Sequence, residues 1–366
     1  MLKAVNPEFY RSFFPELKVE LDAISVFDSV TDEYNTLSSG AAFRDLSGEG
    51  IFEITGADSL DFLHRISTND LKGVVESRAA YTIFTNEKGR MIDRALVVNT
   101  GSSIFLVSSG VHFHKMNSWL NKYIIAEDIK ISIADKYFVN EISGKQASSF
   151  LVLVFGSAPE ENFTVKKADL EGIPFHIIKT EELGSVKYYI LGEKRYSETL
   201  FQYMMQNKMI FDFRPVGTQS YEIFRIEKGI PKAPNEIDDQ YNPNDSLLIK
   251  DVSFTKGCYI GQEVIARLDT YGKTQRILCA MELDTDSDIS ALRLPVQLFD
   301  GENNEAGVIT SAVHSPYMRK NIGMGYVKSS IFADGKVLKT AAAEAAKEIS
   351  AVLRPLPMVP PRTANY

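Results

Sequence analysis

The chain has 366 residues, a length that predicts two or three domains, and its content of 44% hydrophobic and 24% charged residues is typical of globular proteins. A largely disordered chain is excluded, because there are enough apolar side chains to form a core. The formal net charge of −8 argues against a general nucleic-acid-binding protein, which needs clustered Lys and Arg to displace the counterions of the phosphate backbone.

The first half of the chain mixes strand-like and helix-like segments in irregular order. Residues 51–55 alternate between two faces, as in a half-buried strand, and residues 58–66 place Leu60, Leu63 and Ile66 about one helical turn apart. The same patterns predict strands at 81–85, 93–99, 104–108 and 129–133, a turn at 86–89 and a helix at 113–123. This order favours an α+β fold over a regular βαβ repeat.

The second half of the chain changes its pattern near residue 272. Before that point we predict strands at 150–155, 175–179 and 187–191 and helices at 193–205 and 218–228. Beyond residue 274 short strand-like runs follow one another at 277–283, 296–299, 306–311 and 325–327, separated by turn residues, as in a small β-barrel or sandwich. The predicted organisation is an N-terminal extension (1–39), a body (40–272), a C-terminal β-barrel domain (273–355) and a tail (356–366).

The cysteine content and the N-terminal sequence predict the cellular compartment of the protein. The two cysteines, Cys258 and Cys279, form no C-x-x-C pair, so neither a disulfide-stapled secreted scaffold nor a metal site is predicted. The N-terminus lacks the apolar run of a signal peptide, and the longest apolar run, at 150–155, is too short to span a membrane. We therefore expect a reduced, cytoplasmic protein without a membrane partner.

Cys258 lies in an unusual local setting. It stands between Gly257 and Gly261, two residues after Lys256. Glycines let a backbone approach a ligand closely, and a nearby ammonium group lowers the pKa of a thiol and so raises its thiolate fraction. A buried cysteine in a tight turn is the common structural alternative. No histidine lies near Cys258 in the sequence, so a Cys–His nucleophile is not indicated.

The segment around Cys258 resembles a known family. Residues 256–263, K-G-C-Y-I-G-Q-E, are similar to the K-G-C-Y-x-G-Q-E signature of the YgfZ family, within the glycine-cleavage T-protein superfamily. The resemblance extends over residues 40–355 through shorter motifs at 56–70, 86–93, 224–231 and 307–327. It implies a T-protein-like folate-binding α+β body with a small C-terminal β-barrel domain, and tetrahydrofolate or a one-carbon derivative as the cofactor. It also implies Cys258 as the working thiol, and iron–sulfur client proteins or assembly factors as partners.

Glu227 is a candidate for binding the pterin ring of the folate. Residues 224–231, F-R-I-E-K-G-I-P, are similar to the L-R-L-E-A-G-M-P element of T-proteins, whose glutamate holds the pterin. A carboxylate can accept hydrogen bonds from both the ring N–H and the neighbouring exocyclic amine. The alternative is a solvent-facing helix glutamate paired with Arg225 or Lys228.

Asp93 is a candidate catalytic residue. Residues 86–93 are similar to the N-x-x-G-G-x-x-D turn of T-proteins, with Asn86 at its start and Arg90 in place of the second glycine. In that family the aspartate lies near folate N10, where a carboxylate can stabilise a cationic transition state. Here Arg94 follows, where T-proteins show a second aspartate, and this reversal of charge argues against aminomethyl transfer. Alternatively, Asp93 and Arg94 simply flank a strand.

Basic side chains near Cys258 are candidates for the carboxylates of the folate tail. We expect Lys256 and Arg267 to contribute, with Lys273 and Arg276 close by, although a solvated basic stretch is the alternative. The leading hypothesis is a tetrahydrofolate-binding accessory protein that supports iron–sulfur cluster assembly or repair. A folate-dependent aminomethyltransferase is the alternative, so whether the protein is an enzyme stays open. A folate-dependent demethylase and a module that binds no folate are weaker alternatives.

Overall fold

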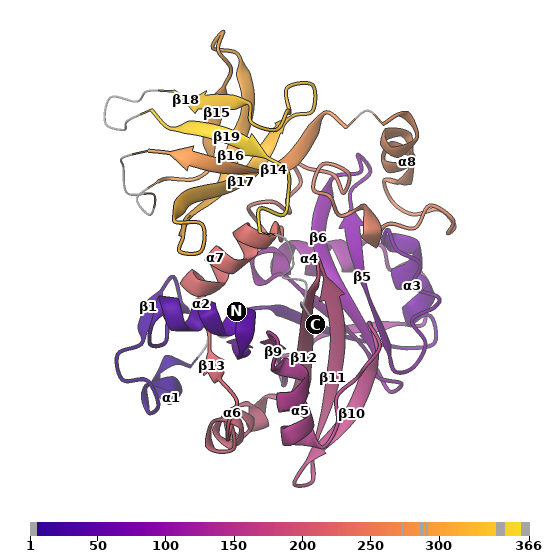
Figure 1. The fold of residues 1–366 in the computed structure, drawn as a ribbon. Helices are drawn as coiled ribbons and strands as arrows, with labels where there is room; N and C mark the ends of the chain where they lie inside the picture. The colour runs from indigo at the N-terminus through magenta and orange to yellow at the C-terminus, as the bar shows by residue number, and fades with distance from the viewer. Residues whose placement is uncertain (1–5, 273, 286–288, 290–291, 342–347, 360–366) are drawn as a thin grey trace. The chain divides into compact units, whose positions relative to one another are not determined.

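The computed structural model describes residues 6–272, 274–285, 289, 292–341 and 348–359 (Figure 1). The chain divides into two compact units. Unit 1 comprises Met1–Phe84 and Asp93–Tyr221, and unit 2 comprises Thr85–Ile92 and Glu222–Tyr366. Unit 2 therefore includes a short segment from the middle of the first half of the chain.

Unit 1 contains a six-stranded sheet. Its strand order is β10 (Val165–Leu170), β11 (Ile173–Glu182), β12 (Ser185–Glu193), β9 (Tyr137–Ser143), β3 (Ala41–Asp45) and β13 (Phe213–Pro215). Neighbouring strands are antiparallel except β13, which runs parallel to β3. One face packs on α1 (Pro7–Arg11), α5 (Ala147–Phe155) and α6 (Ser197–Gln206). Residues 7–39, expected as an extension, supply Tyr10, Leu17, Ile24 and Phe27 to this core.

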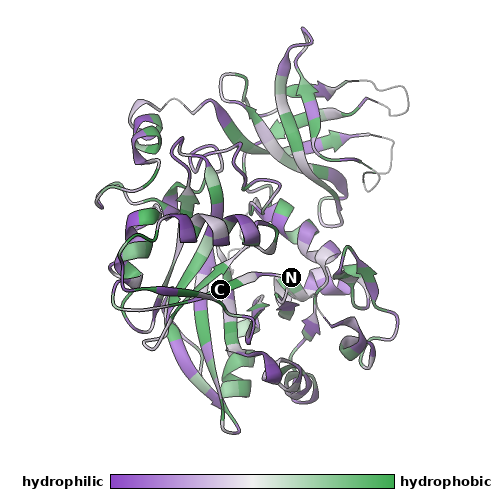
Figure 2. Ribbon diagram, turned by 180° about the vertical axis from the view of Figure 1, so that it is seen from behind, coloured by the Kyte–Doolittle hydropathy of each residue, from purple (hydrophilic) through white to green (hydrophobic). Residues whose placement is uncertain are grey.

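Unit 1 also contains a five-stranded sheet. Its order is β5 (Arg78–Thr85), β6 (Met91–Asn99), β7 (Ile104–Ser108), β4 (Gly50–Thr55) and β8 (Lys130–Ile133). A second apolar cluster joins the two sheets, with Leu96, Val98 and Phe105 from this sheet and Val139, Ile178 and Leu191 from the other. Figure 2 shows apolar stretches along the strands, interrupted by polar residues. The remaining elements of unit 1 are β1 (Lys18–Glu20), β2 (Ala23–Val26), α2 (Val30–Ser39), α3 (Ser59–Ile66), η1 (Gly110–His112), α4 (Phe113–Lys122) and η2 (Lys194–Tyr196).

Unit 2 contains a closed six-stranded β-barrel. Its order is β14 (Arg276–Asp284), β17 (Lys320–Lys328), β16 (Glu305–Ser315), β15 (Val296–Phe299), β18 (Val337–Thr340) and β19 (Ser350–Arg354). The interior is apolar, with Met281, Leu298, Ile309 and Leu353 fully buried. The helix α7 (Thr218–Lys228) runs from the end of unit 1 into unit 2, and η3 (Ile249–Asp251) and α8 (Gln262–Tyr271) precede the barrel. The predicted α+β body with a C-terminal barrel is confirmed.

One predicted strand is wrong. Residues 150–155 belong to the helix α5, although Val152, Val154 and the aromatic residues favour a strand. The helix buries Ala147, Phe150, Leu151 and Val154, the i, i+3, i+4, i+7 spacing of one helical face. A short apolar run does not distinguish a buried strand from a buried helix, and here tertiary packing decides.

Candidate functional site

The segment with Cys258 forms an exposed loop in unit 2. Residues 256–261, here called the Cys258 loop, lie between η3 and α8. Cys258 is exposed, whereas Lys256 and Tyr259 are buried, and Lys256 Nζ lies 5.2 Å from the centroid of the Tyr259 ring. The loop therefore presents the thiol to solvent while its neighbours anchor the backbone.

The turn 86–89 packs directly on the Cys258 loop. Gly261 has a φ of 82°, and a Cβ atom there would lie 2.5 Å from Asn86 O, so only glycine allows this approach. Thr85 Oγ1 donates a hydrogen bond of 2.6 Å to Ile260 O. Asn86 Oδ1 accepts from Lys88 N at 2.9 Å and from Arg90 N at 3.1 Å. The structure thus brings Asn86 to the loop, with its side chain oxygen shaping the turn.

The two cysteines differ in environment. Cys279 is buried in β14, and burial raises the pKa of its thiol to about 12. A thiol with such a pKa stays protonated at neutral pH and reacts slowly. Cys258 is the accessible thiol. Arg267, on α8, is also exposed, whereas Lys273 lies outside the described residues.

Glu227 is buried within unit 2. Its side chain is 2% exposed, and Oε1 accepts a hydrogen bond of 2.6 Å from Ser315 Oγ. Ser315, at the end of β16, in turn accepts from Met318 N at 2.9 Å. The carboxylate thus ties α7 to a barrel strand, and the sequence alternative of a solvent-facing glutamate is wrong.

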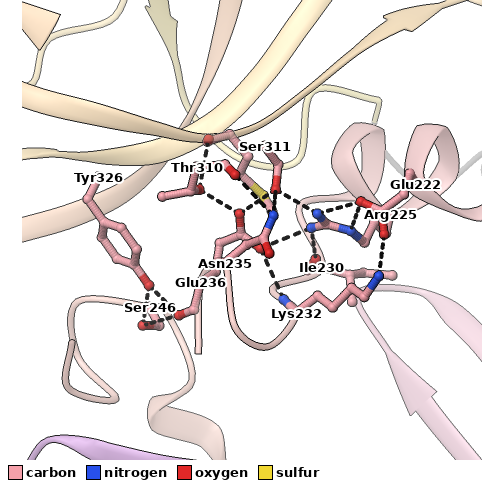
Figure 3. A network of polar contacts seen from close by, with 11 residues as sticks. Glu222, Arg225, Ile230, Lys232, Asn235, Glu236, Ser246, Thr310, Ser311 and Tyr326 are labelled. Carbon is pink, nitrogen blue, oxygen red and sulfur yellow. Dashed lines mark hydrogen bonds and ion pairs between the residues drawn. The ribbon is translucent and has the colours of Figure 1, made fainter. Parts of the chain in front are cut away.

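Arg225, two residues earlier, is at the centre of a buried polar network (Figure 3). Its Nη1 contacts Glu236 Oε2 at 3.0 Å, and its Nη2 donates to Ser311 Oγ at 2.6 Å. Glu236 Oε1 accepts from Thr310 Oγ1 at 2.5 Å and from Ser311 Oγ at 2.7 Å. Glu222 accepts from Arg225 Nε at 2.7 Å. Because its members satisfy one another, this network is a structural tie between α7 and the barrel.

Asp93 is fully buried in unit 1, on β6. Its Oδ2 accepts from Ser109 N and its Oδ1 from Ser109 Oγ, both at 2.8 Å. His112 Nδ1 lies 3.4 Å from Oδ1. The carboxylate therefore holds the segment that leads from β7 into α4, and it has a basic ring beside it.

A buried group of charged and tyrosine side chains lies in unit 1 where sequence patterns gave no signal. It comprises the buried Glu141, Lys187 and Tyr221 with the partly buried Arg44 and Tyr189, and we call it the inner charge cluster. The strand register places Arg44 opposite Glu141 and Glu141 opposite Tyr189, so these side chains share one sheet face.

Contacts in the inner charge cluster are short. Arg44 Nη1 lies 3.0 Å from Glu141 Oε2, and the Arg44 guanidinium lies 3.3 Å from the centroid of the Tyr221 ring. Lys187 Nζ donates to Tyr221 OH at 3.3 Å. Glu141 Oε1 and Ser143 Oγ are both buried, and a hydrogen bond between these two side chains contributes to the lowered pKa of Glu141.

The inner charge cluster keeps its charges at neutral pH. Burial lowers the pKa of Lys187, but interactions with Tyr221 and with the Glu141 carboxylate outweigh this effect and raise that pKa overall. Burial raises the pKa of Glu141, and the charges of Arg44 and Lys187 outweigh that effect and lower it. Lys187 and Glu141 therefore lie buried as charged groups, with the partly buried Arg44 beside them.

Comparison with known proteins places this chain in a family. Residues 4–256 match the GCVT N-terminal domain, and residues 276–359 match the glycine cleavage T-protein C-terminal barrel domain. The chain belongs to the glycine-cleavage T-protein family. The finer assignment to the YgfZ branch rests on the Cys258 motif alone.

Relatives of this T-protein family chain support the same assignment. It is 25% identical over 309 residues to an aminomethyltransferase of Thermoanaerobacter pseudethanolicus, covering 83% of this chain and 82% of that one. It is 25% identical over 338 residues to a putative chloroplastic transferase of Arabidopsis thaliana, covering 88% and 73%. The crystal structure of aminomethyltransferase T of the glycine cleavage system from Bartonella henselae has a TM-score of 0.85 at 18% identity and covers 98% of both chains. The expected T-protein fold is confirmed.

Arg94 departs from the T-protein motif, in which a second aspartate follows the first. Its guanidinium forms two contacts with the Glu182 carboxylate, at 3.0 and 3.2 Å, and lies 4.0 Å from the centroid of the Tyr81 ring. Both charged side chains are nearly buried. The positive charge beside Asp93 in the sequence is therefore neutralised by a bidentate ion pair.

Two further observations concern metals and membranes. Across the described ranges, no group of three or more His, Cys, Asp or Glu side chains could hold a metal ion. In the same part of the chain, no helix combines the length and apolar character needed to cross a bilayer.

Proposed function

We propose that this T-protein family member is a tetrahydrofolate-binding accessory protein of the YgfZ branch that supports iron–sulfur cluster assembly or repair through Cys258. The observation that carries the proposal is the exposed thiol on a loop whose path requires Gly261. A thiolate is the form of cysteine that attacks electrophiles and binds metals. Exposure lets such a group meet a protein client, whereas Cys279 lies inside the barrel.

The inner charge cluster fits the folate that the family implies. A pterin ring needs a carboxylate acceptor and flat side chains, and the cluster combines the Glu141 carboxylate with the rings of Tyr189 and Tyr221. Glu227 stays a second candidate for the pterin, with its Oε1 already accepting a hydrogen bond from Ser315. Asn86, Lys256 and Arg267 stay candidates for the rest of the cofactor.

Aminomethyl transfer is the second candidate function, with Asp93 as its working residue. The names of the curated relatives favour it. Bound tetrahydrofolate would supply the nitrogen that accepts a one-carbon unit, and Asp93 would orient that nitrogen. The Arg94–Glu182 pair weighs against this candidate, because it replaces a carboxylate of the T-protein motif with a paired cation.

One experiment separates the two functions. Ammonia release from an aminomethyl-lipoyl carrier protein is measured with and without tetrahydrofolate, and folate binding is measured by calorimetry. We expect binding without release at enzymatic rates. Folate-dependent release at such rates would instead establish an aminomethyltransferase. Absence of folate binding would contradict both.

The same calorimetry identifies the pterin-binding carboxylate. Removing a charged acceptor of two hydrogen bonds costs about 1.5–3 kcal/mol per bond, so we expect Glu141→Gln to weaken folate binding by tenfold or more. Glu227→Gln is the matched comparison, because it changes a second buried carboxylate in the other unit. A larger loss of folate affinity in Glu227→Gln than in Glu141→Gln would assign the pterin to Glu227.

A further inference from the structure

One side-chain hydrogen bond ties the Cys258 loop to a distant part of the sequence. Within the part of the chain that the structure describes, the Thr85 hydroxyl is the one side-chain group that hydrogen-bonds to residues 257–260, and it donates to Ile260 O at 2.6 Å. The two residues are 175 positions apart. The backbone bond from Gln262 N to Tyr259 O, at 3.3 Å, joins only neighbours in the sequence. The Thr85 bond therefore fixes the loop against the rest of unit 2.

Thr85 lies where a strand ends and a turn begins. It is the last residue of β5, and it is 1% exposed. The turn that follows is closed by hydrogen bonds from Asn86 N to Arg90 O and from Gly89 N to Asn86 O, both at 2.9 Å. The hydroxyl thus reaches the loop from a backbone that hydrogen bonds already hold.

The turn is itself anchored to another segment of unit 2. Met91 N donates to Tyr241 O at 2.9 Å, and Arg90 Nη1 donates to Gln240 O, also at 2.9 Å. Arg90 stands where the T-protein motif has its second glycine, and a glycine has no side chain to form this bond. The turn therefore gives Thr85 a fixed position from which to hold the loop.

The residues around Cys258 divide into held and exposed ones. Lys256 and Tyr259 are buried, with 9% and 8% of their surface exposed, whereas Gly257 and Cys258 are exposed. A Cβ atom at Gly257 would meet nothing within 4 Å. Because the chain just before the thiol borders open space, the position of the thiol depends on the contacts that follow it. Among these is the bond to Ile260 O.

We infer that Thr85 is a positioning residue for Cys258, because its hydroxyl holds the Ile260 carbonyl and so fixes where the loop presents the thiol. The inference rests on the proposed function, in which Cys258 is the working group. Thr85 acts through the loop backbone and not on the thiol itself. A purely structural role would instead make the loss of any buried threonine hydroxyl on β5 equivalent.

Three variants distinguish positioning from a structural role. Thr85→Val removes the hydroxyl and keeps the shape of the side chain, while Thr85→Ser keeps the hydroxyl. Thr82→Val is the matched control on the same strand, because Thr82 is also buried and its Oγ1 accepts from Asn69 N at 3.0 Å. Thr82 lies three residues before Thr85, so its side chain points to the opposite face of β5.

The rate at which a thiol reagent labels Cys258 at neutral pH is the first measurement. A hydrogen bond of ordinary net strength shifts an equilibrium by about two- to tenfold, so we expect Thr85→Val to change this rate by more than twofold. Thr85→Ser and Thr82→Val should stay within twofold of wild type. Circular dichroism checks folding, and Thr85→Ala replaces Thr85→Val if the latter does not fold. A smaller change in Thr85→Val, or a larger one in Thr82→Val or Thr85→Ser, would overturn the inference.

Iron–sulfur enzyme activity in cells that lack the protein separates this inference from the proposed function. At equal protein levels, we expect Thr85→Val to restore less activity than Thr85→Ser. If Cys258→Ser restores full activity, the proposed function fails, and the labelling rates alone judge the positioning of the loop. If Cys258→Ser fails to restore activity while Thr85→Val restores it fully, the proposed function stands and the positioning role is refuted.

Discussion

At the scale of single residues, burial separates the two cysteines more clearly than sequence does. Cys258 is exposed between glycines, while Cys279 lies in the apolar interior of the barrel with its pKa raised to about 12. Thiolate chemistry needs both ionisation and access. The motif around Cys258 therefore marks the thiol that can do chemistry.

Two measurements check this difference. Labelling with a thiol reagent at neutral pH should modify Cys258 quickly and Cys279 only on unfolding.

In cells that lack the protein, Cys258→Ser should fail to restore iron–sulfur enzyme activity, while the matched variant Cys279→Ala should restore it. Full rescue by Cys258→Ser would contradict the proposed role.

Site residues that are contiguous in the sequence could be predicted, whereas those brought together by strand pairing could not. Residues 256–263 are contiguous, so their unusual composition is visible without a structure. Arg44 and Glu141 are 97 positions apart and meet only because β3 pairs with β9, and neither strand was predicted. A charged residue within an apolar strand normally faces solvent, so nothing in the sequence indicates that these two face the interior.

At the scale of elements, several predicted segments have the observed bounds, and one prediction failed where packing decided. The strands 104–108 and 296–299 and the helix 218–228 have the bounds that the patterns predict. The run 150–155 became a helix because its spacing from Ala147 to Val154 matches one helical face. The helix α8 was not predicted, because Ile265 is the one residue that it buries and a single buried position gives no helical periodicity.

The junction between the Cys258 loop and α8 gives a matched pair of glycine variants. Gly261 and Gly272 bracket α8, and both have positive φ, at 82° and 56°. A Cβ atom at Gly272 would meet nothing within 4 Å, whereas one at Gly261 would lie 2.5 Å from Asn86 O. Gly272→Ala should cost about 1 kcal/mol from backbone strain, and Gly261→Ala should cost about 2 kcal/mol more.

Urea unfolding measures these costs, and thiol labelling reports the shape of the loop. Gly261→Ala should change the labelling rate of Cys258, because the loop must move away from the turn 86–89. Gly272→Ala should leave that rate unchanged. Equal effects of the two variants on stability and labelling would show that the close approach does not hold the loop.

At the scale of the whole molecule, each unit contains a carboxylate that cations hold ionised, buried in unit 1 and partly buried in unit 2. In unit 1 this is Glu141, with its pKa lowered by Arg44 and Lys187 against the effect of burial. In unit 2 it is Glu222: burial raises its pKa, but the charges of Arg225 and Lys232 prevail and lower it to about 2. Since the folded pKa lies below the unfolded value, each carboxylate stabilises the folded state above the unfolded pKa, and loses that effect as pH falls through the folded one.

Acid should therefore weaken both units, and the pKa of Glu222 sets the pH range for unit 2. The free energy of unfolding should fall between about pH 4.5, the ordinary pKa of a glutamate, and pH 2. The variant Glu222→Gln lacks the ionised carboxylate, so its free energy of unfolding at neutral pH should be lower than that of wild type by on the order of 2–3 kcal/mol. The difference between wild type and variant should then shrink as pH approaches 2. Urea unfolding followed by circular dichroism at a series of pH values measures it, and a difference that stays constant down to pH 2.5 would show that Arg225 and Lys232 do not hold Glu222 ionised.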